Sequence, residues 1–304
     1  MKTRWCAPRR AGWCERIVVI AGAVALAAGC SKKPESAAPA ASASGASAAG
    51  GTASAPATGT PAASGSAGGS APTTKDTGKL VFDYQPPKNP RFAPLREYVA
   101  PAEIPAVIEL VNKVVALPRD VPVRTEECDQ ANAFYDPDRH ALILCFELPE
   151  HIYKQVKALD VDDEQASKVT REAVLFSFLH ELGHVMIGEL ELGVTGGEEN
   201  VADDFATLLL IDVERPDIIE SGAVAMYQLG KAGDQPKMWD EHAFGEQRFF
   251  NILCTLVGSN PETFGPRYVP APLPVERGRR CEDEYKKKDK AWTNLLKPHA
   301  KVAL

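Results

Sequence analysis

The chain has 304 residues, with 34 Lys and Arg against 41 Asp and Glu and a formal net charge of −7. Residues 1–78 hold 8 basic and 3 acidic residues, so residues 79–304 hold 34 − 8 = 26 basic and 41 − 3 = 38 acidic residues, a net charge of −12. A domain this acidic repels phosphate backbones, which argues against nucleic acid as its main partner. The exception would be a basic patch at Lys286, Lys287 and Lys288, which we interpret instead as a solvated helix face or tail.

The N-terminal residues have the order of a secretory signal. Basic residues precede a short apolar run, residues 17–29, which is too short to cross a hydrocarbon core of ~30 Å as a helix. The small residues before Cys30 resemble a bacterial lipobox, and the resemblance implies that Cys30 is lipidated and anchors the chain to a membrane. Ser31 stands where an inner-membrane retention signal usually has Asp, so we expect an outer-membrane lipoprotein facing the periplasm or the exterior. The alternative is a chance cysteine after a plain signal peptide.

Low-complexity sequence follows the predicted signal, residues 1–30. Residues 36–74 are all Ala, Ser, Gly, Pro or Thr. This stretch has no large side chains to bury, so nothing offsets the entropy lost on ordering it. We therefore predict a disordered linker over residues 31–78 and one folded domain over residues 79–304.

The pattern of apolar residues in this domain predicts an α+β fold. Its elements, in chain order, are a helix over 101–117, strands at 121–124, 132–135 and 140–148, and helices over 150–159, 164–190, 198–211, 218–231 and 242–258. The helix over 164–190 is apolar nearly all round, which is typical of a buried central helix. Thr195 and Glu198 read as the capping box of the next helix. We expect a small sheet or hairpin packed on the central helix, followed by a mainly helical C-terminal half.

Four cysteines lie in the predicted domain. Cys128 and Cys145 flank a hairpin with its turn at 136–139, where the numbers of opposed residues should sum to about 275. This pair sums to 273, which favours a disulfide across the strands and leaves Cys254 with Cys281. A Cys₄ zinc site is the alternative, but the close C-x₂-C spacing of such sites is missing.

The central helix contains the sequence His-Glu-Leu-Gly-His at 180–184. Residues four apart lie on one helix face, so His180 and His184 can bind one Zn²⁺. Glu181 is the predicted catalytic base, because it can take a proton beside the ion without binding the ion. Polar residues inside an apolar helix are unfavourable unless they are paired or bind metal. The alternative is two core histidines bonded to the backbone.

A catalytic zinc needs a third protein ligand. The metzincin pattern would require Gly at 187 and His at 190, where Ile187 and Leu190 stand. The E-x-x-x-D arrangement that begins at Glu199 resembles the gluzincin metallopeptidases. This resemblance implies that Glu199 is the third ligand and that Asp203 orients a ligand histidine, with Glu198 as the competing ligand.

Most of residues 95–285 resemble a family of bacterial secreted proteins and lipoproteins classed as zinc metallopeptidases, without an assigned substrate. The matching pieces are Cys128 with residues 132–137, residues 144–148, the two helices that carry the motifs, and a segment from Trp239 to Cys254. The resemblance implies a zincin fold. His242 is a candidate donor to the developing oxyanion, or else a helix-start residue bonded to its acidic neighbours. Arg248 could bind a substrate carboxylate, although pairing with one of the many acids is favoured.

The expected activity is hydrolysis of a peptide or protein substrate that uses one Zn²⁺ per chain, with Glu181 moving the proton. By analogy with zincins, an extended peptide would pair with residues 141–146 as the edge of the sheet. Two alternatives remain. The first is a zinc-binding lipoprotein without turnover, and the second is an envelope binding or assembly factor in which the motif is incidental.

Overall fold

The computed structural model describes residues 74–232 and 245–302. The predicted signal segment, Cys30, most of the linker and His242 lie outside the described residues. The helices are η1 (Pro90–Leu95), α2 (Arg96–Val99), α3 (Glu103–Val114), α4 (Glu147–Lys157), α5 (Asp163–Glu189), α6 (Glu198–Asp212), α7 (Pro216–Ala232), α8 (Gly245–Ser259), α9 (Pro261–Tyr268), α10 (Val275–Gly278), α11 (Cys281–Leu296) and η2 (Lys297–His299). None of the helices in this part of the chain is long and apolar enough to cross a membrane.

Four strands, β1 (Leu80–Asp83), β2 (Val121–Glu126), β3 (Ala133–Asp136) and β4 (Ala141–Cys145), form one sheet in the order β1-β2-β4-β3. The first three in this order are parallel, and β3 runs antiparallel to β4. The predicted α+β fold, with a small sheet and a mainly helical second half, is confirmed. The expectation that residues 141–146 form the sheet edge is wrong, because β4 lies between two strands and β3 forms the edge.

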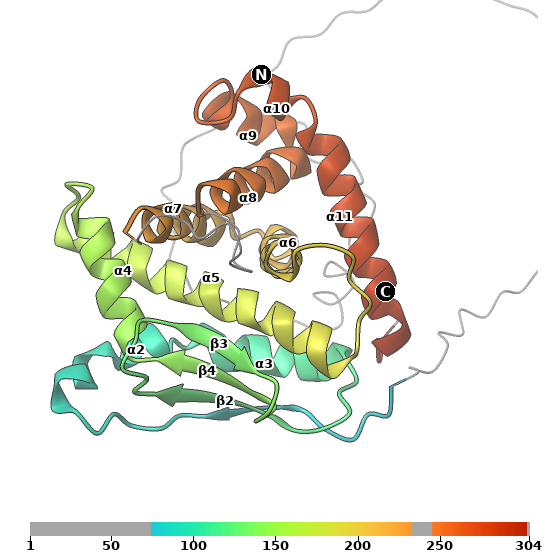
Figure 1. The fold of residues 1–304 in the computed structure, drawn as a ribbon. Coiled ribbons are helices and arrows are strands. Elements are labelled where there is room, and N and C mark those ends of the chain that lie inside the picture. The colour runs from blue at the N-terminus through green and yellow to red at the C-terminus, as the bar shows by residue number, and fades with distance from the viewer. Residues whose placement is uncertain (1–73, 233–244, 303–304) are drawn as a thin grey trace, which may run out of the picture. The chain divides into compact units, whose positions relative to one another are not determined.

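The sheet is covered on one face by α5, which also packs against α6 and α7 on its other side (Figure 1). Asp162 begins α5 by accepting a hydrogen bond from the main-chain N–H of Gln165. Apolar side chains on every face of the helix are buried, including Phe176, Phe178 and Leu182. A helix surrounded in this way holds polar groups in its middle at fixed positions, shielded from water.

Both predicted disulfides are present, but the first has a different structural basis. The β3–β4 register pairs Ala133 with Leu144, a sum of 277 rather than 275, and β3 begins well after Cys128. Cys128 instead follows β2, in which Glu126 pairs with Cys145. The Cys128–Cys145 bond therefore ties the loop after β2 to the end of β4, with 5.5 Å between the two Cα atoms.

The start of α6 also differs from the prediction. Gly197 is the N-cap, and no side chain caps the helix, so the capping box of Thr195 and Glu198 is wrong. The physical reason lies in the Glu198 carboxylate, which contacts the His184 ring instead of reaching back to the backbone.

Candidate metal centre

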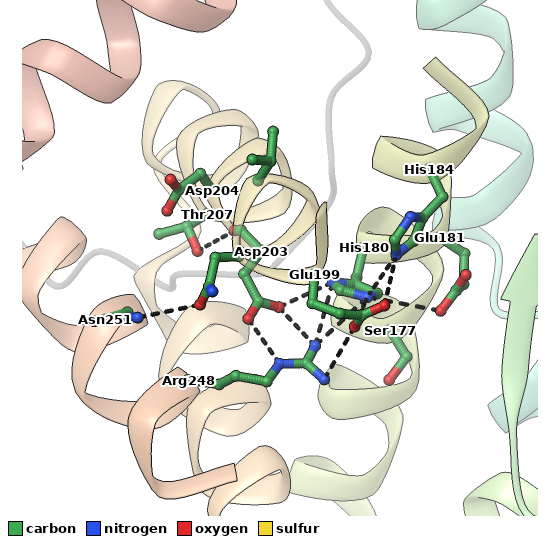
Figure 2. Close-up of polar contacts among 12 residues, drawn as sticks. Ser177, His180, Glu181, His184, Glu199, Asp203, Asp204, Thr207, Arg248 and Asn251 are labelled. Atoms are coloured by element: carbon green, nitrogen blue, oxygen red, sulfur yellow. Dashed lines mark hydrogen bonds and ion pairs between the residues drawn. The ribbon is translucent and has the colours of Figure 1, made fainter. Parts of the chain in front are cut away.

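The two motif helices approach each other closely at Gly183. A Cβ atom at this position would lie 3.0 Å from the Cα of Ala202, so only a residue without a side chain leaves α6 this near to α5. The approach brings Glu199, about one turn before Ala202, to the face of α5 that carries His180 and His184 (Figure 2).

Three donor groups converge between the helices. The Nε2 atoms of His180 and His184 are 3.2 Å apart. One oxygen of Glu199 lies 3.2 Å from Nε2 of His180, and its other oxygen lies 3.3 Å from Nε2 of His184. A tetrahedral ion with bonds of about 2.0–2.1 Å requires donors about 3.3–3.4 Å apart. The donors of the three groups are therefore close enough to share one such ion, and together they make a group that could hold a metal ion.

Each histidine is oriented by a carboxylate at its other ring nitrogen. Asp203 Oδ1 lies 2.9 Å from Nδ1 of His180, and Glu198 Oε1 lies 2.8 Å from Nδ1 of His184. A proton on Nδ1 satisfies each contact and leaves the Nε2 lone pair directed at the centre. Glu198, the competing ligand from the sequence, thus lies behind His184, while Glu199 lies in the donor cluster.

The buried carboxylate of Asp203 is bound by Arg248 from α8. The guanidinium Nε donates to Oδ2 and Nη2 to Oδ1, both at 2.8 Å, and Nη1 lies 3.5 Å from Glu199 (Figure 2). Arg248 is 8% exposed and Asp203 is 2% exposed, so this two-bond pair is shielded from water. The sequence favoured ion pairing for Arg248, and the structure gives it this partner.

Electrostatics keep the carboxylates of the centre ionised. Burial opposes ionisation, yet the two imidazoles hold the pKa of Glu199 well below its usual range, and Arg248 with His180 lowers the pKa of Asp203 to about 2. Burial alone would lower the pKa of His180, but Asp203 and Glu199 raise that pKa to about 9.

Glu181 lies beside the donor cluster without joining it. One of its oxygens is 3.9 Å from Nε2 of His180, and the other accepts a hydrogen bond of 3.0 Å from the main-chain N–H of Tyr135 on β3. Burial raises the pKa of Glu181 above its ordinary value, against the opposing effect of the two histidines. A raised pKa suits a group that must accept a proton and give it up again near neutral pH.

Tyr135 and His140 form a second polar cluster that the sequence did not indicate. The Tyr135 hydroxyl donates to Glu189 Oε1 at 2.7 Å, and Nδ1 of His140 lies 2.8 Å from the same oxygen. Arg119 binds the other oxygen of Glu189 at 3.2 Å. The cluster fastens β3 and the hairpin turn to the end of α5. The local sequence alone gave no signal for it, because Arg119, the β3–β4 hairpin and the end of α5 are far apart along the chain.

The comparisons with known proteins agree with this geometry. The model of a family described as "Putative metallopeptidase" matches residues 84–296. The chain belongs to this metallopeptidase family. No curated protein and no solved structure matches the chain significantly. Membership of a metallopeptidase family supports proteolysis and a bound metal ion, and the donor cluster of His180, His184 and Glu199 fits that ion.

Proposed function

We propose that this protein hydrolyses peptide bonds with one zinc ion held by His180, His184 and Glu199. The observation that carries the proposal is the convergence of three donor groups at separations that suit one shared ion. Two imidazoles and one carboxylate form a ligand set that suits zinc.

When bound, zinc supplies Lewis-acid chemistry, polarising the scissile carbonyl and activating water. Glu181 accepts the proton released by the attacking water and passes it to the leaving amine. The hydrogen bond from the Tyr135 N–H fixes one Glu181 oxygen, so the other faces the centre. Asp203 and Glu198 keep the protons on Nδ1 of the two histidines, and Arg248 holds Asp203 in its charged form.

The edge of β3 that faces away from β4 is the candidate surface for the peptide. The main-chain N–H of Cys145 donates to the carbonyl of Asn132, so the antiparallel alternation turns the backbone groups of Ala133 and Tyr135 away from β4. An extended peptide that paired with the backbone groups of Ala133 and with the carbonyl of Tyr135 would lie beside Glu181, because the Tyr135 N–H is already bonded to this side chain.

We further propose that a lipid on Cys30 tethers the protein to the outer membrane. The support is the lipobox-like sequence that ends at Cys30, with Ser31 after it. Replacing Cys30 by serine should move the protein from the membrane fraction to the soluble fraction of fractionated cells. Retention of the variant in the membrane fraction would contradict the tether.

The decisive test measures metal content and hydrolysis of full-length protein purified in detergent. We expect about one zinc per chain, loss of hydrolysis of a fluorogenic peptide library after chelation, and recovery when zinc is restored. Zinc binding without hydrolysis of any library member would favour the silent zinc-binding lipoprotein. Absence of zinc after reconstitution would favour the envelope binding or assembly factor. The first outcome alone supports the proposed activity.

A further inference from the structure

The helix that carries Glu199 is held from its outer side by two helices that do not contribute a metal ligand. Nδ2 of Asn251 on α8 donates to Oδ1 of Asn200, and Nε1 of Trp292 on α11 donates to the carbonyl of Val201, both at 3.2 Å. Figure 1 shows α6 nearly end-on between α5, α8 and α11. Since Glu199 lies in the first turn of α6, its carboxylate moves wherever this backbone moves.

A largely buried ion pair joins all three helices. Nζ of Lys288 on α11 lies 2.6 Å from Oδ1 of Asp204 on α6, and it also donates to the Thr255 hydroxyl on α8 at 2.8 Å. The side chains of Lys288 and Asp204 are 21% and 18% exposed. The sequence predicts that Lys288 is part of a solvated lysine run. That interpretation is wrong for Lys288, whose ammonium group turns inward.

A disulfide links α8 to α11 next to this ion pair. Cys254 directly precedes Thr255 in α8. It is bonded to Cys281, the first residue of α11, with 4.9 Å between the two Cα atoms. The backbones also touch, because a Cβ at Gly258 would lie 2.1 Å from the carbonyl oxygen of Cys281. The two helices are therefore fixed to each other independently of α6.

We propose that α8 and α11, cross-linked by Cys254–Cys281, form a clamp that holds α6 where Glu199 meets the two histidines, and that Lys288 is a positioning residue of this clamp. The inference rests on the proposed zinc site. A preorganised ligand set binds an ion more tightly, because less ordering free energy is lost on binding. The affinity of the site for zinc thus depends on a helix that does not touch the ion.

The first test compares the two disulfides in full-length protein. Replacing Cys254 and Cys281 by serine should weaken zinc affinity about 10-fold, the lower range for groups that orient ligands. Replacing Cys128 and Cys145 by serine, which removes the link between the loop after β2 and the end of β4, should leave the affinity close to that of the wild type. Affinity is measured by competition with a chromogenic chelator, without thiol reductants, which bind zinc themselves. Equal losses in both double variants, or no loss in the first, would overturn the clamp.

The second test separates positioning from folding. Changing Lys288 to methionine together with Asp204 to asparagine removes both charges, so no buried charge is left unpaired and the fold should persist. We expect normal thermal unfolding of the metal-free protein but about 10-fold weaker zinc binding, with Lys288→Arg close to wild type. If the serine variants do not fold, the double variant at Lys288 and Asp204 still tests the clamp. A stable double variant with wild-type zinc affinity would refute the role of Lys288, whereas a wild type that binds no zinc would refute the site itself.

Discussion

Replacing Glu181 by glutamine should lower kcat/KM for peptide hydrolysis by about 10²–10⁴-fold, the usual contribution of a general acid–base group. Glutamine has the same shape, and its carbonyl oxygen can still accept the N–H of Tyr135, so the geometry beside the centre is retained. What is lost is the ability to take and return a proton. The measurement is kcat/KM on whichever library peptide the wild type cleaves.

Zinc content provides the internal control for this variant. Because Glu181 is not among the three donors, Glu181→Gln should keep about one zinc per chain. Glu164→Gln is a matched substitution, since Glu164 lies in the first turn of the same helix, is exposed, and should retain full activity. Activity of Glu181→Gln within about 10-fold of wild type would mean that another group accepts the proton.

Zinc affinity should fall by well over about 100-fold when Glu199 is replaced by alanine, because removal of a ligand exceeds the 10–100-fold effect of losing a group that orients one. Two histidines alone leave the ion with too few protein donors. Asp203 and Arg248 remain paired in this variant, so the fold should be kept. Chelator competition measures the affinity, and circular dichroism of the metal-free protein monitors the fold.

The neighbouring residue Glu198 is a stringent comparison for Glu199. Both are glutamates in the first turn of α6, but the carboxylate of Glu198 lies 2.8 Å from the outer nitrogen of His184 and is about half exposed. Glu198→Ala should therefore weaken zinc binding by only about 10-fold. If Glu198→Ala lost the metal and Glu199→Ala kept it, the assignment of the third ligand would be reversed.

The candidate metal-binding group could be recognised in the sequence because part of its pattern is local. Residues four apart in a helix share a face, so His180 and His184 needed no knowledge of the rest of the fold. Glu199 and Asp203 came from the resemblance to the gluzincin metallopeptidases, and their spacing of four places both on one face of α6. The choice between Glu198 and Glu199 depended on where α6 begins, and helix starts are poorly determined by sequence.

The remaining features depend on contacts between distant parts of the chain. The order of the strands, with β4 inside and β3 at the edge, follows from pairing across long loops that no local pattern encodes. The sequence contains many acidic residues that could pair with Arg248, so its partner could not be predicted. The packing of α8 on α6 brings it to Asp203. The prediction for Lys288 was wrong for the same reason. A lysine in a polar helix is expected to be exposed, and its partner Asp204 lies on a different helix.

The hydrogen bond between the β3 main chain and Glu181 gives this strand a role in orienting the proposed catalytic base. If a peptide binds along β3, the same strand then contacts the substrate and orients Glu181, which transfers the proton. Changes to the strand that broaden substrate choice would then disturb turnover as well, so specificity and speed could not evolve independently here. The hydrogen bond from the Tyr135 hydroxyl to Glu189 limits such changes, because it fixes β3 to α5 through a side chain and not through the strand's backbone.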